Sequence, residues 1–351
     1  PPMAHVLPVL RSLVVALTGA LVCVWIRSPL PWLIGPLVAV AFASMLHGRL
    51  ASPPGGRQVG QWIIGVALGL YFSPDVVREV VRLGPWVALA VAFALALGAL
   101  GSWLLGKMVA TDAPTAFFGM AIGGASEMAV LAERHGGQVE RVAAAHSLRI
   151  MLVVLIVPLL LNAFDVHGLD PYVPIAREFS WGGFVLLAAV TGGTAWAMRR
   201  AGSPNSWMIG PLLAAAVVTS MGITWSSLPV PVVNAGQLLI GIGLGTRFTP
   251  EFFESAPRFL GAVAAITLVY LVIAAVFGWL LSAGSGLHWS TALVATTPGG
   301  IGEMALTAKA LRLGVPIVAA FHATRMAAVV LGVGVTYRTW KRWKERRGGI
   351  A

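Results

Sequence analysis

Two short stretches of this sequence place an acid just after paired glycines in otherwise apolar surroundings. One reads AIGGASEMA, residues 121–129, and the other reads TTPGGIGEMA, residues 296–305. Paired glycines interrupt a helix, and the first amides of the helix that follows favour negative charge. Glu127 and Glu303 fall in the first turn of those following segments. We therefore predict two designed interruptions, each presenting polar backbone and one carboxylate.

A second pair of motifs, HSLR at 146–149 and HATR at 322–325, puts a histidine and an arginine on one helix face. The arginines can hold a substrate carboxylate or the glutamates, because a guanidinium matches a carboxylate. They can equally form a structural salt bridge or bond to carbonyls at the interruptions. The histidines can relay protons or be plain packing residues. The two glutamates and the two arginines lie inside apolar runs, and their charges sum to zero. This favours ion pairs between the glutamates and the arginines.

The candidate site for a substrate or ion combines these motifs with the neighbouring hydroxyls, which can contact an ion or cap a helix. No catalytic residue and no metal ligand is predicted, because the histidines are scattered and no acid–histidine cluster has metal-ligand spacing. No nucleotide-binding motif is present, so no cofactor is expected beyond a coupling ion, H⁺ or Na⁺. The candidate residues are Glu127, Glu303, Arg149, Arg325, Gly123, Gly124, Gly299, Gly300, Ser126, Thr297, His146 and His322.

The composition places the chain in the lipid bilayer. Its 351 residues are 58% hydrophobic and 11% charged, whereas a soluble domain is roughly 25% charged. The net charge of +11 gathers in the C-terminal tail and in short gaps between apolar runs. That distribution is typical of cytoplasmic loops and not of a nucleic-acid interface. The single cysteine, Cys23, excludes a disulfide within one chain.

The sequence is internally duplicated. PWLIGPL at 31–37 matches SWMIGPL at 206–212, and GQWIIGVALGLYFSP at 60–74 matches GQLLIGIGLGTRFTP at 236–250. The two glutamates share the spacing, since 303 − 127 = 176. Transporters are commonly built from such repeats. We predict a first membrane repeat over 1–165, a second over 176–338 and a basic cytoplasmic tail over 339–351.

Positive charge decides how the repeats are oriented. If the Gly-Gly element of each repeat enters the membrane and returns, sixteen Lys and Arg residues lie inside and six lie outside. Each repeat then crosses five times, and an odd number inverts the second repeat. We expect an all-α polytopic protein with ten spans and two re-entrant or broken helices, both termini being cytoplasmic. Twelve spans with crossing broken helices stays open.

Other features of the two halves predict packing. Glycines four apart favour close helix contacts, and prolines within apolar runs should kink or break a helix. Two glutamines at run starts can line a pathway. These residues are Gly65, Gly69, Gly241 and Gly245, then Pro36 and Pro211, then Gln61 and Gln237.

The paired GGASEMA…HSLR and GGIGEMA…HATR motifs, with WLIGPL or WMIGPL opening each half, resemble the AbrB-type family of duplicated bacterial membrane proteins. Its members carry labels of ammonia monooxygenase or AbrB regulator. The family is grouped with the cation–proton antiporter and anion transporter superfamily. The resemblance therefore implies a secondary transporter with inverted repeats, broken helices crossing near the midplane and often a homodimer. It also implies the bacterial cytoplasmic membrane, but it names no substrate.

Three functions are compatible with these observations. We favour a secondary active transporter, and not an enzyme, that moves a small organic anion or amino-acid-like solute with H⁺ or Na⁺. A membrane monooxygenase would hold copper or iron after purification. A sensor or regulator that binds other proteins through its basic tail would bind a ligand without flux.

Overall fold

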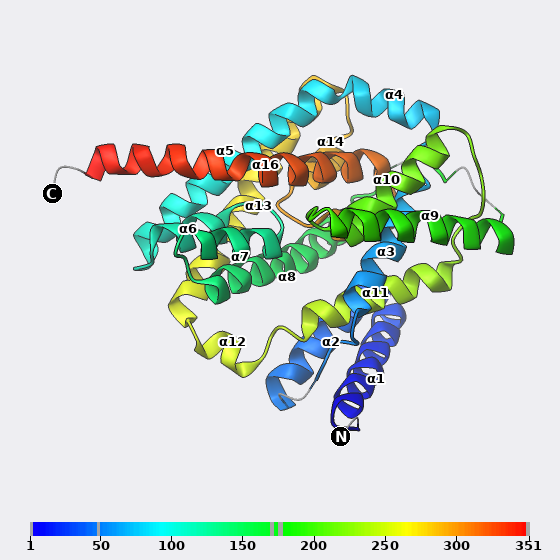
Figure 1. Ribbon diagram of the computed structural model, residues 1–351, viewed down its shortest axis with the longest axis horizontal. Coiled ribbons are helices and arrows are strands. Elements are labelled where there is room, and N and C mark those ends of the chain that lie inside the picture. Colours follow the sequence, from blue (N-terminus) through cyan, green and yellow to red (C-terminus); the bar gives the residue numbers. More distant parts are fainter. Residues whose placement is uncertain (1–2, 48–49, 169–171, 175–177, 349–351) are drawn as a thin grey trace.

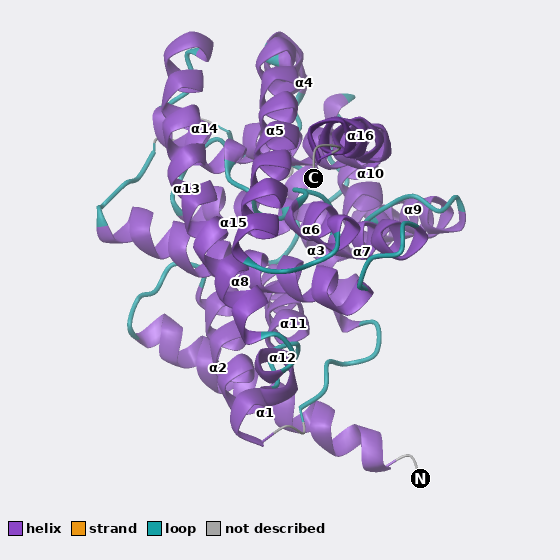
Figure 2. Cartoon of the chain, turned by 90° about the vertical axis from the view of Figure 1, so that its left-hand side faces the viewer, coloured by secondary structure: helices purple, strands orange, loops and turns teal. Residues whose placement is uncertain are grey.

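The computed structural model describes residues 3–47, 50–168, 172–174 and 178–348 (Figure 1). Over these residues the chain is helical and contains no strand (Figure 2). The first half contains α1 Met3–Trp25, α2 Pro31–His47, α3 Gly56–Gly69, α4 Pro74–Arg82, α5 Gly84–Met108, α6 Ala113–Met120, α7 Ala125–Arg134 and α8 Val139–Ala163. The second contains α9 Trp181–Arg200, α10 Ser206–Ser220, α11 Val230–Gly245, α12 Pro250–Glu254, α13 Pro257–Ser285, α14 Trp289–Thr296, α15 Ile301–Ala310 and α16 Val315–Gly348.

The described helices confirm a polytopic membrane protein. Six of them, α1, α5, α8, α9, α13 and α16, are long and apolar enough to cross a bilayer. Helices α2, α10 and α11 are apolar but shorter, and α3 has 14 residues. The predicted ten spans require these four shorter helices to cross as well, so that number stays a prediction. Helix α16 also runs beyond the predicted repeat boundary at 338, so the basic segment begins as helix.

The two halves use the same elements and the same packing partners. Helix α1 packs on α2 as α9 packs on α10, and α7 packs on α8 as α15 packs on α16. Contacts between the halves are exchanged in the same way: α2 lies against α11 and α10 against α3, while α5 lies against α16 and α13 against α8. The short helices α4 and α12 are well separated, near the top and in the lower part of both views (Figures 1 and 2). This exchange is what a two-fold relation between the halves produces. Inversion in the membrane stays a prediction.

Glycines make the exchanged contacts close, as predicted. A Cβ on Gly65 would lie 2.5 Å from the Met208 carbonyl oxygen, and one on Gly241 would lie 2.8 Å from that of Leu33. Helix backbones therefore approach directly, which is how small residues hold membrane helices together. Pro36 and Pro211 pack against these glycines from inside α2 and α10, and neither proline ends its helix. The expected break is therefore wrong, and a kink at these prolines stays a prediction.

Each Gly-Gly element folds back on itself as a hairpin, and its re-entry into the membrane stays a prediction. The Thr115 hydroxyl, at the start of α6, accepts a hydrogen bond of 2.7 Å from the Gln138 amide, beyond the end of α7. Thr291 and Gly314 repeat this bond at 3.2 Å in the second half. If α6 and α7 continued in one direction, their 8 and 10 residues would separate these ends by about 27 Å. The crossing arrangement implied by the family resemblance is therefore wrong for this structure.

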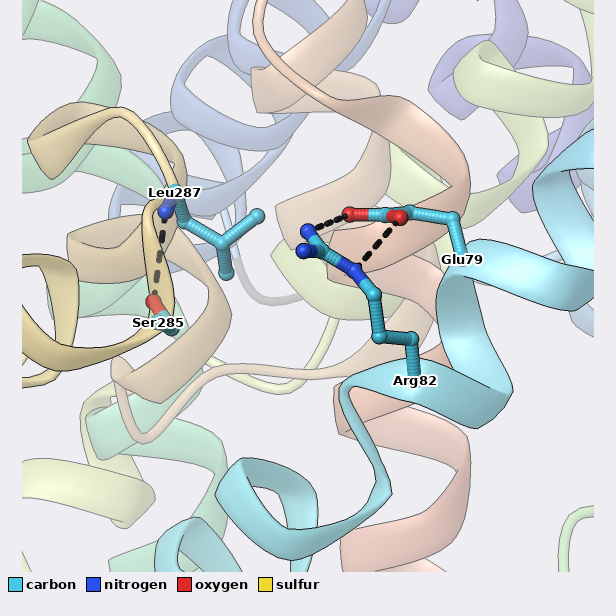
Figure 3. A network of polar contacts seen from close by, with 4 residues as sticks. All are labelled: Glu79, Arg82, Ser285 and Leu287. Carbon is cyan, nitrogen blue, oxygen red and sulfur yellow. Dashed lines mark hydrogen bonds and ion pairs between the residues drawn. The ribbon is translucent and has the colours of Figure 1, made fainter.

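Helix α4 lies just before the long α5 and is polar along one side. The Glu79 carboxylate accepts two hydrogen bonds from Arg82, of 2.6 and 2.9 Å (Figure 3). This hydrogen bond, with the negative charge of Glu79, raises the pKa of the exposed Arg82 guanidinium. The same figure shows the Leu287 amide donating to the Ser285 hydroxyl over 3.3 Å. That turn leads from α13 into the second hairpin.

The hairpin geometry predicts that Ala110 and Glu140, which flank the first hairpin and are exposed, face the same side of the membrane. In a Cys23→Ser background, Ala110→Cys and Glu140→Cys should react with a membrane-impermeant maleimide from one side only, and from the same side. Labelling from opposite sides would show that the element crosses the bilayer.

Candidate functional site

The tips of the two hairpins meet at one cavity of about 430 Å³, here called the central cavity. Residues 123–127 of the first tip and 299–303 of the second line it. Helices α3, α8, α10, α11 and α16, with the end of α9 and the turn that follows it, supply the other walls. Besides the two tips, its lining residues are Arg57, Gln58, Gln61, Ile122, Ile150, Arg199, Ser203, Asn205, Ser206, Trp207, Met208, Ile240, His322, Arg325 and Met326.

The glutamates occupy the predicted first turns. Glu127 is the third residue of α7 and Glu303 the third of α15. Each carboxylate folds back against the glycine that precedes its helix, Gly124 or Gly300, where an added Cβ would overlap it. Neither glycine position has a side-chain cap, so the first amides of both helices lie beside these carboxylates and the cavity without a side-chain partner at the cap. Both side chains are partly exposed to the central cavity.

A third helix N-terminus reaches the same place. Asn205 precedes α10 with φ of 45°, and its backbone amide donates to Glu127 Oε1 over 3.2 Å. Its side-chain oxygen accepts from Gln61 Nε2 over 3.1 Å. The Glu127 carboxylate thus links the N-termini of α7 and α10. Gln61 lines the cavity as predicted, whereas Gln237, its counterpart, is buried and is not a lining residue.

The arginines bind backbone carbonyls at the hairpin tips. Arg149 Nη1 donates to the Ala121 carbonyl over 2.9 Å, and Arg325 Nη1 donates to the Thr297 carbonyl over 2.8 Å. These oxygens terminate α6 and α14, where a helix leaves carbonyls without partners. Among the described residues, no ion pair joins either arginine to Glu127, and the same holds for Glu303. The predicted mutual pairing is therefore wrong, because the guanidinium groups are needed by buried carbonyls that water does not reach.

The histidines support the same two half-helices. His146 Nε2 donates to the Phe118 carbonyl over 2.9 Å, and His322 Nε2 donates to the Val294 carbonyl over 2.9 Å. Both rings are fully buried. Since a carbonyl can only accept, the proton of each neutral ring lies on Nε2.

The two halves differ at the second nitrogen of these guanidinium groups. In the first half, Arg149 Nη2 donates to His146 Nδ1 over 3.0 Å. In the second half, Arg325 Nη2 donates instead to the Gly299 carbonyl over 2.5 Å. Only the second pair, His322 and Arg325, lines the central cavity, so the predicted His146 and Arg149 lie behind its wall.

The two predicted hydroxyls also differ. Ser126 lines the cavity and is exposed. Thr297 is 1% exposed, and its hydroxyl donates to the Leu293 carbonyl over 2.8 Å. Thr297 therefore secures the end of α14 and does not face the cavity. The four predicted glycines, Gly123, Gly124, Gly299 and Gly300, all line it.

Two cavity arginines were not predicted as site residues. Arg57 of α3 and Arg199 of α9 line the cavity, although in sequence they look like charges that only orient the membrane helices. Nearby, Arg247 donates to the Ser147 hydroxyl over 2.9 Å. Burial, and then the Arg57 charge, lower the pKa of Arg247 to about 10, whereas Glu303 raises it.

Among the residues that the structure describes, no three or more His, Cys, Asp or Glu side chains form a group that could hold a metal ion.

Comparison with known proteins gives the family. A model described as "Transition state regulatory protein AbrB" matches residues 32–341. The chain belongs to this AbrB family. It is 25% identical over 313 residues to "Putative regulator AbrB" of Escherichia coli (strain K12), covering 87% of this chain and 88% of that one. It is 26% identical over 342 residues to "Uncharacterized protein YhjN" of Bacillus subtilis (strain 168), covering 88% and 86%.

The carbonyl contacts predict that Arg149→Lys destabilises the protein. A single ammonium cannot serve both the Ala121 carbonyl and His146, and a buried acceptor left without a donor costs about 1–3 kcal/mol. The melting temperature in detergent should fall. Arg134→Lys, at the exposed end of α7, is the matched control and should leave it unchanged. Equal melting temperatures for both variants would contradict this role.

Proposed function

We propose that this chain is a secondary active transporter of a small organic anion or amino-acid-like solute, coupled to H⁺ or Na⁺. The observation that carries the proposal is that both hairpin tips, contributed by equivalent halves, line the central cavity. Interrupted helices at matching positions of two repeats mark the binding site in many transporters. The central cavity is then the solute site, and the chain is not an enzyme.

The donors around the cavity support an anionic group on the solute. Three helix N-termini, those of α7, α10 and α15, contribute lining residues, and such ends attract negative charge. Arg57, Arg199 and Arg325 add three guanidinium groups, which match carboxylates in shape. Glu127 and Glu303 offset two of these charges, leaving room for one anionic group.

The glutamates supply the coupling. Protonation of Glu127 weakens its bond to the Asn205 amide, or a Na⁺ ion binds the two carboxylates directly. Either event changes the link between the first hairpin and α10. In the first case, the anionic solute takes the place of the Glu127 carboxylate at the helix terminus. In the second case, the solute and the carboxylate bind together.

The side from which the cavity opens follows from charge. Arg57 and Arg199 line it, and both belong to the cytoplasmic set in the predicted topology. We infer that this conformation faces the cytoplasm, in a bacterial inner membrane with both termini cytoplasmic. Because each half makes the same contacts with the other, the two halves can exchange their conformations, and the cavity then opens to the opposite side. A homodimer would leave this exchange intact.

Glu127→Gln and Glu303→Gln test the coupling. Glutamine keeps an acceptor for the Asn205 amide but removes the charge. In proteoliposomes exposed to a panel of organic acids and amino acids, each variant should lose flux driven by an H⁺ or Na⁺ gradient, by at least about tenfold, as expected for one charged contact of about 1.5–3 kcal/mol. Glu133→Gln, at the exposed end of α7, is the control and should retain flux.

Unchanged gradient-driven flux in both variants would overturn the coupling role. Ligand binding by the wild type without flux of any panel compound would instead favour a regulatory receptor, the activity that the name of the Escherichia coli relative suggests for that protein.

A further inference from the structure

One acceptor at the wall of the central cavity is left without a donor. His322 is fully buried, its Nε2 donates to Val294, and its Nδ1 has no hydrogen-bond partner. His322 is also a lining residue of the cavity. In the neutral ring, Nδ1 carries a lone pair and no proton. A buried polar atom without a partner is costly, so its presence beside a cavity points to a missing donor.

The first half of the chain shows how this acceptor is normally satisfied. There, Arg149 Nη2 donates to His146 Nδ1, and the pair lies behind the cavity wall. In the second half the corresponding nitrogen of Arg325 is bound to the Gly299 carbonyl. In the half that does not line the cavity, the arginine of the motif satisfies the histidine Nδ1. In the half that lines the cavity, the histidine Nδ1 has no donor.

Among the residues that the structure describes, no group donates to His322 Nδ1. The Gly299 carbonyl also lies close to the His322 ring, but a carbonyl is itself an acceptor. Arg325, which is 7% exposed, has one unused donor, Nε. Its other two nitrogens are bound to the hairpin backbone. His322 and Arg325 lie three residues apart on α16, and both line the cavity. Each keeps one buried polar atom without a partner, an acceptor on His322 and a donor on Arg325.

We propose that His322 Nδ1 accepts a hydrogen bond from a hydroxyl or amino group of the solute, next to a carboxylate that Arg325 Nε and the hairpin amides hold. The site then selects 2-hydroxy or 2-amino carboxylates over plain carboxylates of the same length. This inference rests on the proposed function only in taking the central cavity as the solute site. His322 is a specificity-determining residue, and it need not take up a proton.

The test compares solutes that differ by one hydroxyl. Binding of malate against succinate, and of lactate against propionate, is measured by calorimetry on the full chain in detergent, at about pH 8, where a histidine ring is neutral. The wild type should prefer the hydroxy acid of each pair by about tenfold or more, since an acceptor left unpaired in the complex is costly.

Three variants assign the preference to one nitrogen. His322→Gln keeps an amide that can reach Val294 but removes the acceptor, so the preference should fall to about one. His322→Asn places an oxygen near the Nδ1 position and should restore part of it. His135→Gln, at an exposed position outside the cavity, is the control and should leave the preference intact. Melting temperatures establish whether each variant is folded. If His322→Gln does not fold, the comparison of His322→Asn with the wild type still tests the inference.

Equal affinities within both pairs, a preference unaltered by His322→Gln, or no binding of any of the four acids would overturn the inference. Gradient-driven flux of acids that bind without preference would leave the transport proposal standing and remove only this inference. A preference that depends on His322 but is accompanied by no flux would support this inference and contradict the transport proposal.

Discussion

The ends of the interrupted helices govern this structure. A helix leaves its first amides and last carbonyls without partners, and apolar surroundings supply no water to replace them. Each hairpin tip places two such ends at the centre of the protein. The carbonyl ends are met by Arg149 and Arg325, and the amide ends face Glu127, Glu303 and the cavity. Charged side chains inside the apolar chain are thus structural counterparts of the interruptions.

The arginines and the glutamates of the two hairpins therefore have different roles, the first structural and the second available for binding. The guanidinium groups of Arg149 and Arg325 bond mainly to backbone oxygens. They therefore hold the hairpin tips in place and do not pair with the two glutamates. The glutamates are less committed. Glu127 accepts a hydrogen bond from the Asn205 amide, and the Glu303 carboxylate lies against Gly300 at the start of α15. Competition between a tethered and a free carboxylate for the same helix ends is a simple way to couple protonation to binding.

Much of this arrangement follows from the sequence, because its signals are local or repeated. The duplication, the interruption at Gly123 and Gly299 and the first-turn glutamates all depend on neighbouring residues. The re-entrant path was only one of two alternatives, since it depends on the tertiary bond between Thr115 and Gln138. Asn205 could not be found, because the α9–α10 turn joins the cavity only through folding. The duplication aligns Asn205 with Leu30, but the positive φ that the two residues share is visible only in the structure.

The departures from symmetry are informative because the two halves are otherwise alike. A site on a two-fold axis should be lined by both copies of each motif, yet the central cavity takes Gln61 and His322 without their counterparts Gln237 and His146. The unused copies are buried and, in the case of His146, internally satisfied. If the halves exchange conformations, His146 Nδ1 must lose its bond to Arg149 as it reaches the cavity, while His322 gains the equivalent bond. The arginine–histidine contact would then be made in one half at a time. At the histidine that lines the cavity, a donor on the solute would replace the guanidinium that the conformational change withdraws.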